Sequence, residues 1–276
     1  MLIEDKITAI FCVIDDVLKH TGYQEDIRRK VSDSEVITAA ISSALFFYGN
    51  QERTLCYLKG SGLMPNMLEK SRFNRRVTAV SYWIYELFIQ SGRYFKDFRC
   101  DMEYVIDSFP VPVCDNIRIS RCKLLKGEQW RGYCASLRRY YYGVKVQLII
   151  TKEGIPTDFY FVPASEHDSK ILESMDYSFN PESVLYGDAA YTNYQTEELL
   201  KEHEQILLEV ARKSNSKKPK SISAEYIIDH YRKRIETTIS DIKKLFPRTI
   251  HAVTRKGFLL KIMLFIFAIQ LNMCLN

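Results

Sequence analysis

The hydrophobic pattern of this 276-residue chain changes its period near residue 102. Before this point, apolar residues recur every three or four positions, as they do on the buried face of a helix. After it, short runs rich in β-branched and aromatic residues alternate with helical segments. Strands that alternate with helices pair into a sheet that the helices cover. The pattern therefore predicts an all-helical N-terminal region followed by an α/β region with a mixed sheet flanked by helices.

Three helices are expected in the N-terminal region, at residues 3–20, at about 33–48 and at 71–90. The second begins at a capping box, in which the Ser32 hydroxyl and the Glu35 carboxylate accept hydrogen bonds from otherwise unpaired backbone amides. Gly60, Gly62 and Pro65 interrupt the chain before the third helix.

Five strands are expected in the second region, at residues 103–107, 144–150, 157–162, 184–188 and 206–210. Helices are expected at about residues 169–175, 197–204, 223–245 and 257–271. Gly154-Ile155-Pro156 forms a turn, which makes the second and third strands a hairpin. The segment 213–223 is rich in Lys and Ser and is the most loop-like part of the chain.

The charge of the chain is unevenly distributed. Hydrophobic residues make up 46% and charged residues 26%, which excludes a disordered chain, and the formal net charge is only +5. Residues 111–150, however, carry 8 Lys or Arg against 2 Asp or Glu, and residues 211–261 carry 14 against 4. Such basic segments indicate a polyanionic partner such as nucleic acid.

Cysteine usage and the apolar segments indicate a cytoplasmic protein. The seven cysteines are an odd number without a Cys-x2-Cys pair, and no cleavable signal segment is apparent, so we expect neither disulfides nor structural zinc. The most apolar stretch, residues 262–269, is shorter than the roughly 20 residues that cross a bilayer. We therefore expect a core helix there and no membrane partner.

Three acidic residues can form one site. Asp107 and Asp188 each end an expected strand, where ligands gather in open α/β sheets, and Glu236 flanks the apolar stripe of the helix at 223–245. Carboxylates suit Mg²⁺ or Mn²⁺, and two such ions about 3.5–4 Å apart support in-line displacement at a phosphodiester. Each acid alone also fits a simpler role, as a turn residue, a helix cap or the ion-pair partner of Arg232.

The acids lie in blocks that resemble a known family. Residues 105–108 (VIDS), residues 186–191 (YGDAAY) and the spacing Arg232-x3-Glu236-x6-Lys243 resemble the three catalytic blocks of DDE transposases from bacterial insertion sequences. Nearly the whole chain is most similar to the family of insertion sequence 982. The resemblance implies a ribonuclease H-like catalytic core, in which Asp107, Asp188 and Glu236 are catalytic and hold two Mg²⁺ or Mn²⁺ ions. Where the family pattern has a Tyr that contacts DNA, this chain has Asp229.

Several basic residues are candidates for DNA contact. Arg232 and Lys243 share one helical face with Glu236 and are expected to contact phosphates. The offsets of Arg72, Arg75 and Arg76 resemble those of a recognition helix in a helix-turn-helix. Basic and aromatic residues also interleave between residues 127 and 142, where the DNA-binding candidates are Trp130, Arg131, Arg138 and Arg139. An exposed charged face, or core packing of the aromatic rings, explains these patterns equally well.

The predicted protein is a bacterial transposase that cleaves DNA at the ends of its own element and transfers the strand into target DNA. Residues 1–98 are expected to bind the terminal inverted repeats and to assemble at least a dimer on DNA. Residues 99–276 are expected to form the catalytic domain, with a basic insertion at about 111–139. Two alternatives stay open: a ribonuclease H-like nuclease without strand transfer, and a catalytically silent DNA-binding protein derived from a transposase.

Overall fold

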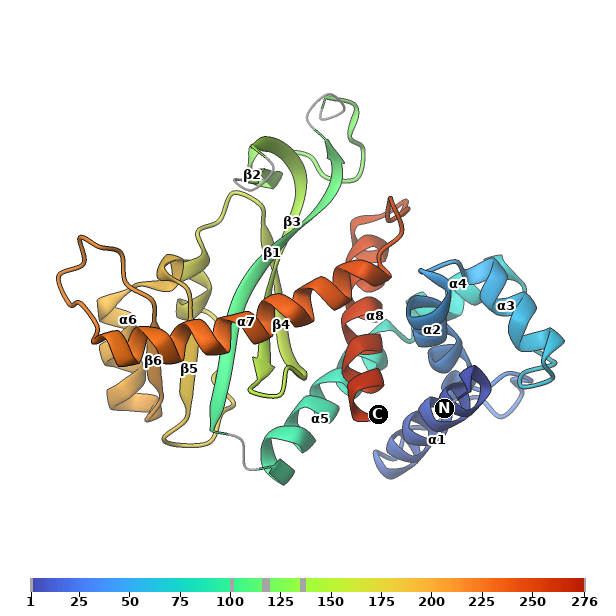
Figure 1. The fold of residues 1–276 in the computed structure, drawn as a ribbon. Coiled ribbons are helices and arrows are strands. Elements are labelled where there is room, and N and C mark those ends of the chain that lie inside the picture. Colours follow the sequence, from blue (N-terminus) through green and yellow to red (C-terminus); the bar gives the residue numbers. More distant parts are fainter. Residues whose placement is uncertain (1, 100–101, 116–119, 135–137, 276) are drawn as a thin grey trace. The chain divides into compact units, whose positions relative to one another are not determined.

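A computed structural model describes residues 2–99, 102–115, 120–134 and 138–275 of the chain. They divide into two compact units, one of residues 1–90 with 241–276 and one of residues 91–240 (Figure 1). The predicted helical N-terminal region and the mixed sheet flanked by helices are both present. The predicted boundary near residue 98 differs from these units, because residues 241–276 cluster with the N-terminal helices.

The first unit is helical. Its helices are α1 (Ile3–His20), α2 (Asp33–Phe47), α3 (Gln51–Gly60), α4 (Lys70–Ala79), the first half of α5 (Ser81–Arg99) and α8 (Arg255–Cys274). Both hydrogen bonds of the predicted capping box start α2: Glu35 N donates to Ser32 Oγ at 3.0 Å, and Ser32 N donates to Glu35 Oε2 at 2.7 Å. The prediction of one helix at 71–90 was wrong, because the chain breaks at Val80 into α4 and α5. Helix α3, which starts at an Asn50 cap, was not predicted.

Helix α8 is apolar on all sides and lies in the core of the first unit. It is the one described helix that is long and apolar enough to cross a membrane, judged by length and composition alone. A core helix passes the same test, and 67% of the apolar window is buried inside the protein. Residues of α8 pack on α2, and the Phe267 ring meets the Phe88 ring at 5.9 Å. This agrees with the predicted core helix.

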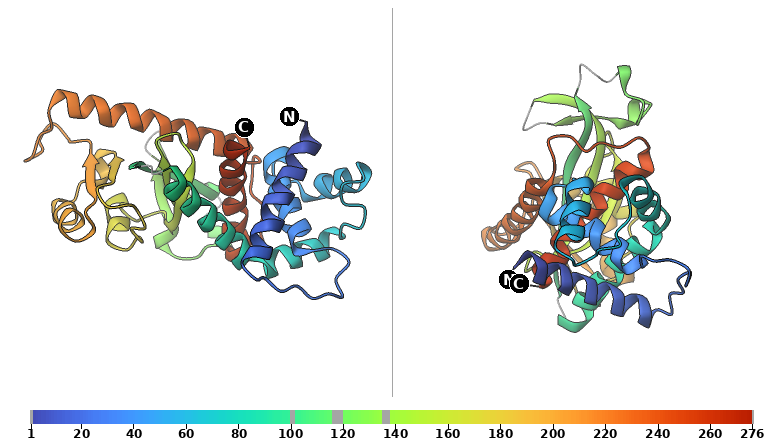
Figure 2. Two further views of the ribbon diagram at one scale, coloured as in Figure 1. Left: turned by 90° about the horizontal axis from the view of Figure 1, so that it is seen from below. Right: turned by 90° about the vertical axis from the view of Figure 1, so that its right-hand side faces the viewer.

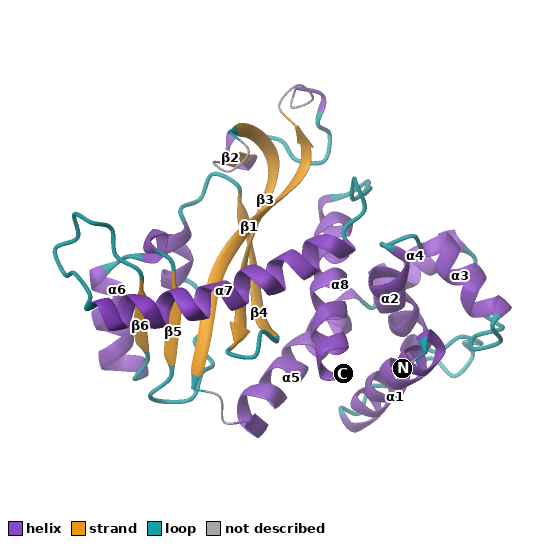
Figure 3. Cartoon of the chain, viewed as in Figure 1, coloured by secondary structure: helices purple, strands orange, loops and turns teal. Residues whose placement is uncertain are grey.

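The second unit contains a six-stranded mixed sheet (Figure 3). The strands are β1 (Glu103–Asp115), β2 (Arg131–Cys134), β3 (Arg139–Thr151), β4 (Pro156–Pro163), β5 (Val184–Gly187) and β6 (Leu207–Val210). Their order is β2-β3-β1-β5-β6, with β4 also paired to β3. Antiparallel pairs join β3 to β1, β2 and β4, whereas β5 is parallel to both β1 and β6. The five predicted strands are all present, and β2 was not predicted.

Strand β1 is longer than predicted. It was expected to stop at residue 107, before Pro110 and Pro112, yet it continues to Asp115 and pairs with β3 along its length. The structure explains how the prolines are accommodated, since β5 pairs only with Glu103–Val105. Beyond that point one edge of β1 faces no strand among the described residues, and a residue without an N–H is tolerated at such an edge. The predicted insertion at 111–139 therefore includes the end of β1 and all of β2, which extend away from the rest of the sheet (Figure 1).

Helical segments cover both faces of the sheet. On one face, the sheet residues Tyr104, Ile106 and Leu185 join a buried core with two short helical segments, Asp168–Glu173 and Leu200–Glu204. Helix α7 (Ile222–Leu245) runs along the other side of the strands (Figure 2). The remaining short elements are Glu128–Trp130, Ala189–Tyr191 and α6 (Tyr194–Leu199).

Candidate active site and nucleic-acid interface

Asp107 and Asp188 lie level with each other on neighbouring strands. In the parallel pair of β1 and β5, Val105 is opposite Tyr186, so two positions further on Asp107 is level with Asp188. Neighbouring strands are about 4.8 Å apart. Asp107 lies in the middle of β1 and not at its end as predicted, but it lies beyond the segment that pairs with β5. The predicted convergence of these two acids on the end of β5 is therefore present.

The environment of Asp107 disfavours a negative charge. Burial raises the pKa of its carboxyl from 3.8 to about 6, and the nearby charge of Asp188 adds to this increase. The Ser108 N–H donates to Asp107 Oδ1 at 2.7 Å and opposes the increase, as does the positive charge of Arg232. A carboxylate with these neighbours gains from a cation placed beside it.

Asp188 is fixed at the end of β5 by a short helical turn. Its Oδ1 accepts a hydrogen bond from the Ala190 N–H at 2.8 Å and so caps the turn Ala189–Tyr191. The turn places Tyr191 in the core, where its hydroxyl donates to Gln147 Oε1. Burial raises the pKa of the Tyr191 hydroxyl, and the charges of Asp168, Asp107 and Asp188 raise it further. The charges of all three aspartates therefore act on one buried phenol.

Helix α7 presents a basic and an acidic side chain to this site. Its apolar stripe is buried as predicted, and Tyr231 on that stripe stacks on the Tyr186 ring of β5 with centroids 4.3 Å apart. Arg232, the next residue, is close enough to lower the pKa of Asp107, and its Nη2 lies 3.9 Å from Glu236 Oε1. The arginine therefore interacts with both Asp107 and Glu236.

Glu236 is not gathered with the two aspartates. Its side chain is 61% exposed and is paired with Arg232. Across the described ranges, no group of three or more His, Cys, Asp or Glu side chains is arranged to hold a metal ion. The structure thus brings Asp107 and Asp188 together. Glu236 is connected to them only through Arg232, which pairs with Glu236 and also acts on Asp107.

The paired aspartates nevertheless fit a divalent cation in their chemistry. Mg²⁺ is typically bound through one or two carboxylates, while water and substrate phosphate complete its shell. Asp107 and Asp188 supply two such groups, and the charge of Asp188 adds to the cost of ionising the buried Asp107. The two aspartates are therefore a donor set that a hard cation satisfies, and Glu236 is not part of it in this structure.

Comparison with known families gives one match. A family described as a transposase DDE domain matches residues 99–271. The chain belongs to this family. The match spans the whole sheet and all three acids, and it supports a transposase function with DNA as the substrate class. The curated proteins and the solved structures that were compared gave no match.

The basic residues predicted in the N-terminal part of this transposase-family chain differ in their surroundings. Arg72 and Arg75 are exposed on α4. Arg76 is only 19% exposed, and its guanidinium hydrogen-bonds the buried carboxylate of Asp33 and lies 3.4 Å from Glu25. Of the three arginines expected on an exposed face, only Arg72 and Arg75 are exposed, because Arg76 pairs with the buried carboxylate of Asp33.

The predicted basic and aromatic segment forms the outer part of the sheet. Tyr133 of β2 and Tyr140 of β3 are 55% and 45% exposed, with ring centroids 5.0 Å apart. The Arg131 guanidinium lies over the Tyr140 ring at 4.6 Å. Arg138 and Arg139 are exposed and Trp130 is half-buried, whereas Tyr141 and Tyr142 are buried. This surface was partly predicted from the sequence, but its organisation by β2 was not.

Lys243 is exposed in the last turn of α7.

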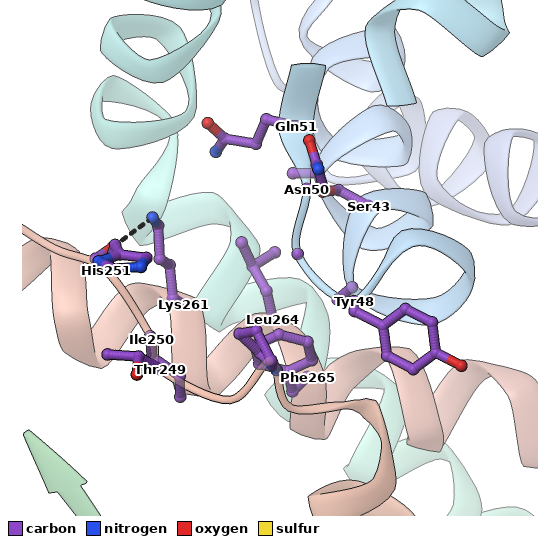
Figure 4. A pocket seen from close by; sticks show the side chains of 14 residues that line it. Ser43, Tyr48, Asn50, Gln51, Thr249, Ile250, His251, Lys261, Leu264 and Phe265 are labelled. Carbon is purple, nitrogen blue, oxygen red and sulfur yellow. Dashed lines mark hydrogen bonds between the residues drawn. The ribbon is translucent and has the colours of Figure 1, made fainter. Parts of the chain in front are cut away.

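A cavity of about 240 Å³ lies in the first unit, away from any pair of acids (Figure 4). It is lined mainly by α2, the segment after it and α8, including Tyr48 and Phe265. Lys261 also lines it and donates to the His251 carbonyl oxygen at 2.5 Å, and burial lowers the pKa of this ammonium. Its lining contains no carboxylate, so the cavity does not suit phosphodiester chemistry that depends on a metal.

Proposed function

We propose that this chain is a DNA transposase with a ribonuclease H-like catalytic core, of the insertion sequence 982 type and of bacterial origin. It cleaves DNA at the ends of its element and joins the freed 3′-hydroxyl to target DNA. One observation carries the proposal: Asp107 of β1 and Asp188, which directly follows β5, are level with each other beside a parallel strand pair in a chain of the transposase DDE domain family. The cost of ionising Asp107, which comes mainly from burial and is increased by the charge of Asp188, supports a cation-binding role for the pair.

In this proposal Asp107 and Asp188 hold Mg²⁺ or Mn²⁺, and Glu236 leaves Arg232 to complete the site. The ions, bound there, supply activation of the attacking oxygen and stabilisation of the leaving oxygen. Water attacks the phosphorus first and the bond to the 3′ oxygen breaks, which leaves a 3′-hydroxyl. That 3′ oxygen then bonds to a phosphorus of the target and loses its proton, while the bond from this phosphorus to the target's own 3′ oxygen breaks and leaves a 3′-hydroxyl. No covalent intermediate with the protein is required.

Arg232 has a second role in the proposal. Its guanidinium interacts with Asp107 and Glu236. With a cation held by these acids, the guanidinium would be free to donate hydrogen bonds to a phosphate oxygen of the DNA. Lys243, on the same helical face, is assigned a further phosphate contact.

The helical N-terminal residues, with Arg72 and Arg75 exposed on α4, are assigned to the terminal inverted repeats and to assembly. Because two DNA ends must be brought together, at least a dimer acts on DNA. The outer part of the sheet, with Arg131, Arg138 and Arg139, is assigned to a DNA strand beside the catalytic centre.

The test uses DNA that carries the sequences flanking this reading frame. Asp107→Asn, Asp188→Asn and Glu236→Gln are each expected to abolish cleavage in Mg²⁺, while Asp176→Asn, an exposed acid, retains it. Full cleavage by any of the first three variants would remove that residue from the site. Cleaved ends that never become joined to a target plasmid would favour the nuclease without strand transfer. Absence of Mg²⁺ or Mn²⁺ binding and of cleavage would favour the silent DNA-binding protein.

A further inference from the structure

A second cavity, of about 520 Å³, opens beside the proposed catalytic centre. The residues that follow Asp188, Ala189 and Ala190, form part of its wall, and so does Asp168, whose charge acts on Asp107. Another part of the wall is the loop that follows β6, the Lys- and Ser-rich segment that the sequence analysis singled out. The catalytic proposal above assigns no role to this loop.

The four lysines of the loop divide into two kinds. Lys218 and Lys220 form ion pairs with Glu198 and Glu209, the former at 3.0 Å. Lys213 and Lys217 line the cavity, and in the described parts of the chain neither pairs with a carboxylate. The two lysines that line the cavity are therefore the two whose charge is not compensated.

The other charges of the cavity cancel. Lys145 also lines it, but its ammonium lies 3.1 Å from Asp168 Oδ1 and donates to the Glu166 carbonyl oxygen at 2.7 Å. The Asp168 carboxylate also accepts a hydrogen bond from the Gln147 amide at 2.7 Å. With Lys145 and Asp168 paired, the lysine and aspartate charges that line the cavity sum to +2, from Lys213 and Lys217.

The loop is anchored so that these two lysines stay at the cavity. Tyr194 of α6, whose side chain also lines the cavity, shares a hydrogen bond of 2.8 Å with Ser216 Oγ. Arg212, at the start of the loop, forms two hydrogen bonds with Glu197, at 2.7 and 2.6 Å, and lies over the Tyr194 ring at 5.1 Å. Because Arg212 and Ser216 are both held in this way, Lys213 and Lys217, which are next to them in the chain, can move only a short way from the cavity.

We infer that this cavity binds the sugar-phosphate backbone of the DNA strand next to the bond that is cut, with Lys213 and Lys217 each neutralising one phosphate. The inference rests on the proposed function. Hydroxyl, amide and ammonium groups supply much of the lining, which suits a phosphodiester backbone better than a stacked base. The small side chains of Ala189 and Ala190 leave room for a backbone to pass close to Asp188.

The test measures binding of the full-length chain to a fluorescent duplex in EDTA, over a range of NaCl concentrations. The logarithm of the binding constant falls linearly with the logarithm of the salt concentration, and each phosphate that the protein neutralises makes this slope steeper by about 0.9. The double variant Lys213→Ala/Lys217→Ala is expected to lose about 1.8 of that slope, which is roughly 60-fold in affinity at 0.1 M salt if binding at 1 M salt is unchanged. Lys218→Ala/Lys220→Ala is the matched control, since glutamates already neutralise these lysines.

A wild-type slope for Lys213→Ala/Lys217→Ala, or an equal loss in the control, would overturn the inference. Lys213→Arg/Lys217→Arg keeps both charges and is expected to restore the slope. Equal urea midpoints for all variants show that the fold is retained, and a cavity-lining variant that lost the fold would be replaced by the single substitutions, each expected to lose about 0.9. The proposed function fails on different results, namely no DNA cleavage by the wild type in Mg²⁺ or full cleavage by Asp107→Asn.

Discussion

Replacing Asp107 by Asn should stabilise the protein in the absence of metal while abolishing its activity. The pKa of this carboxyl rises from 3.8 to about 6 on folding, mainly because it is buried. Folding therefore favours the protonated acid, and its ionisation costs about 1.4 kcal/mol for each unit of increase, or about 3 kcal/mol in total. Asn has the shape of the protonated acid and can still accept the hydrogen bond from the Ser108 N–H.

The dependence on pH identifies the cause. A group whose pKa is raised on folding contributes its full stability below the pKa of the unfolded chain, and this contribution is lost as pH rises through the folded value. The free energy of unfolding of Asp107→Asn should therefore exceed that of the wild type by about 3 kcal/mol at pH 8, by about half of that at pH 5, and by almost nothing at pH 3.5. Urea unfolding of both proteins in EDTA at these three pH values measures the difference.

Adding Mg²⁺ or Mn²⁺ should stabilise the wild type more than Asp107→Asn, which is the opposite of the difference expected in EDTA. A cation that binds only the folded wild type stabilises it by about 2.7 kcal/mol at one hundred times its Kd, whereas Asp107→Asn should gain little. Asp176→Asn, at an exposed position, controls for the loss of one negative charge. An Asp107→Asn variant that is less stable than wild type in EDTA at pH 8 would refute the reasoning, because the carboxylate would then stabilise the fold.

Three further substitutions test the surroundings of the site and the fold. Lys96→Met should cost about 3–5 kcal/mol in urea unfolding, because it leaves Asp158 buried without its ion-pair partner at 2.8 Å, and Lys96→Met/Asp158→Leu should recover part of this loss. Arg76→Ala should lower stability by less, about 1–3 kcal/mol, because Arg29 still pairs with Asp33 at 2.6 Å. It should leave the salt dependence of DNA binding unchanged, since the Arg76 guanidinium is bound to a buried aspartate; a shallower slope would contradict this. Arg232→Ala should raise the pKa of Asp107 further, so the midpoint of Mn²⁺ binding against pH should move upward; an unmoved midpoint would contradict the contact.

The periodicity of the sequence was sufficient to predict elements whose stability comes from local signals. Helix α1 has the predicted limits, and α2 begins at the predicted capping box, since an apolar stripe and a cap are both local features. Strand β1 shows where local rules fail. Its two prolines predicted an end, but the environment that tolerates them is the unpaired edge left by the short strand β5, which only the tertiary pairing reveals. Strand β2 is four residues long and exists as a partner for β3.

The candidate site shows the same division between local and tertiary information. The convergence of Asp107 and Asp188 followed from a general rule about strand ends, and the parallel register of β1 and β5 satisfies it. No comparable rule predicts the partner of a side chain. Arg76 has the spacing of a DNA-reading face, but it pairs with an aspartate 43 positions away that is buried by packing. The two uncompensated lysines of the loop after β6 could be recognised only once the glutamates that pair with their neighbours were located.

Arg232 connects the residues of the candidate site, because its guanidinium interacts with Asp107 of the sheet and with Glu236 of α7. It lowers the pKa of Asp107 and pairs with Glu236, so it partly compensates the charges of both acids. Asp229 also pairs with this guanidinium, at 3.6 Å, so Arg232 would keep one carboxylate partner if Glu236 turned toward the aspartates to help hold a divalent cation. Because Glu236 is 61% exposed, its side chain can turn without breaking any packing in the core. Under the proposed function, a cation held by Asp107 and Asp188 would therefore favour Glu236 over Arg232 as its neighbour, because like charges repel and opposite charges attract.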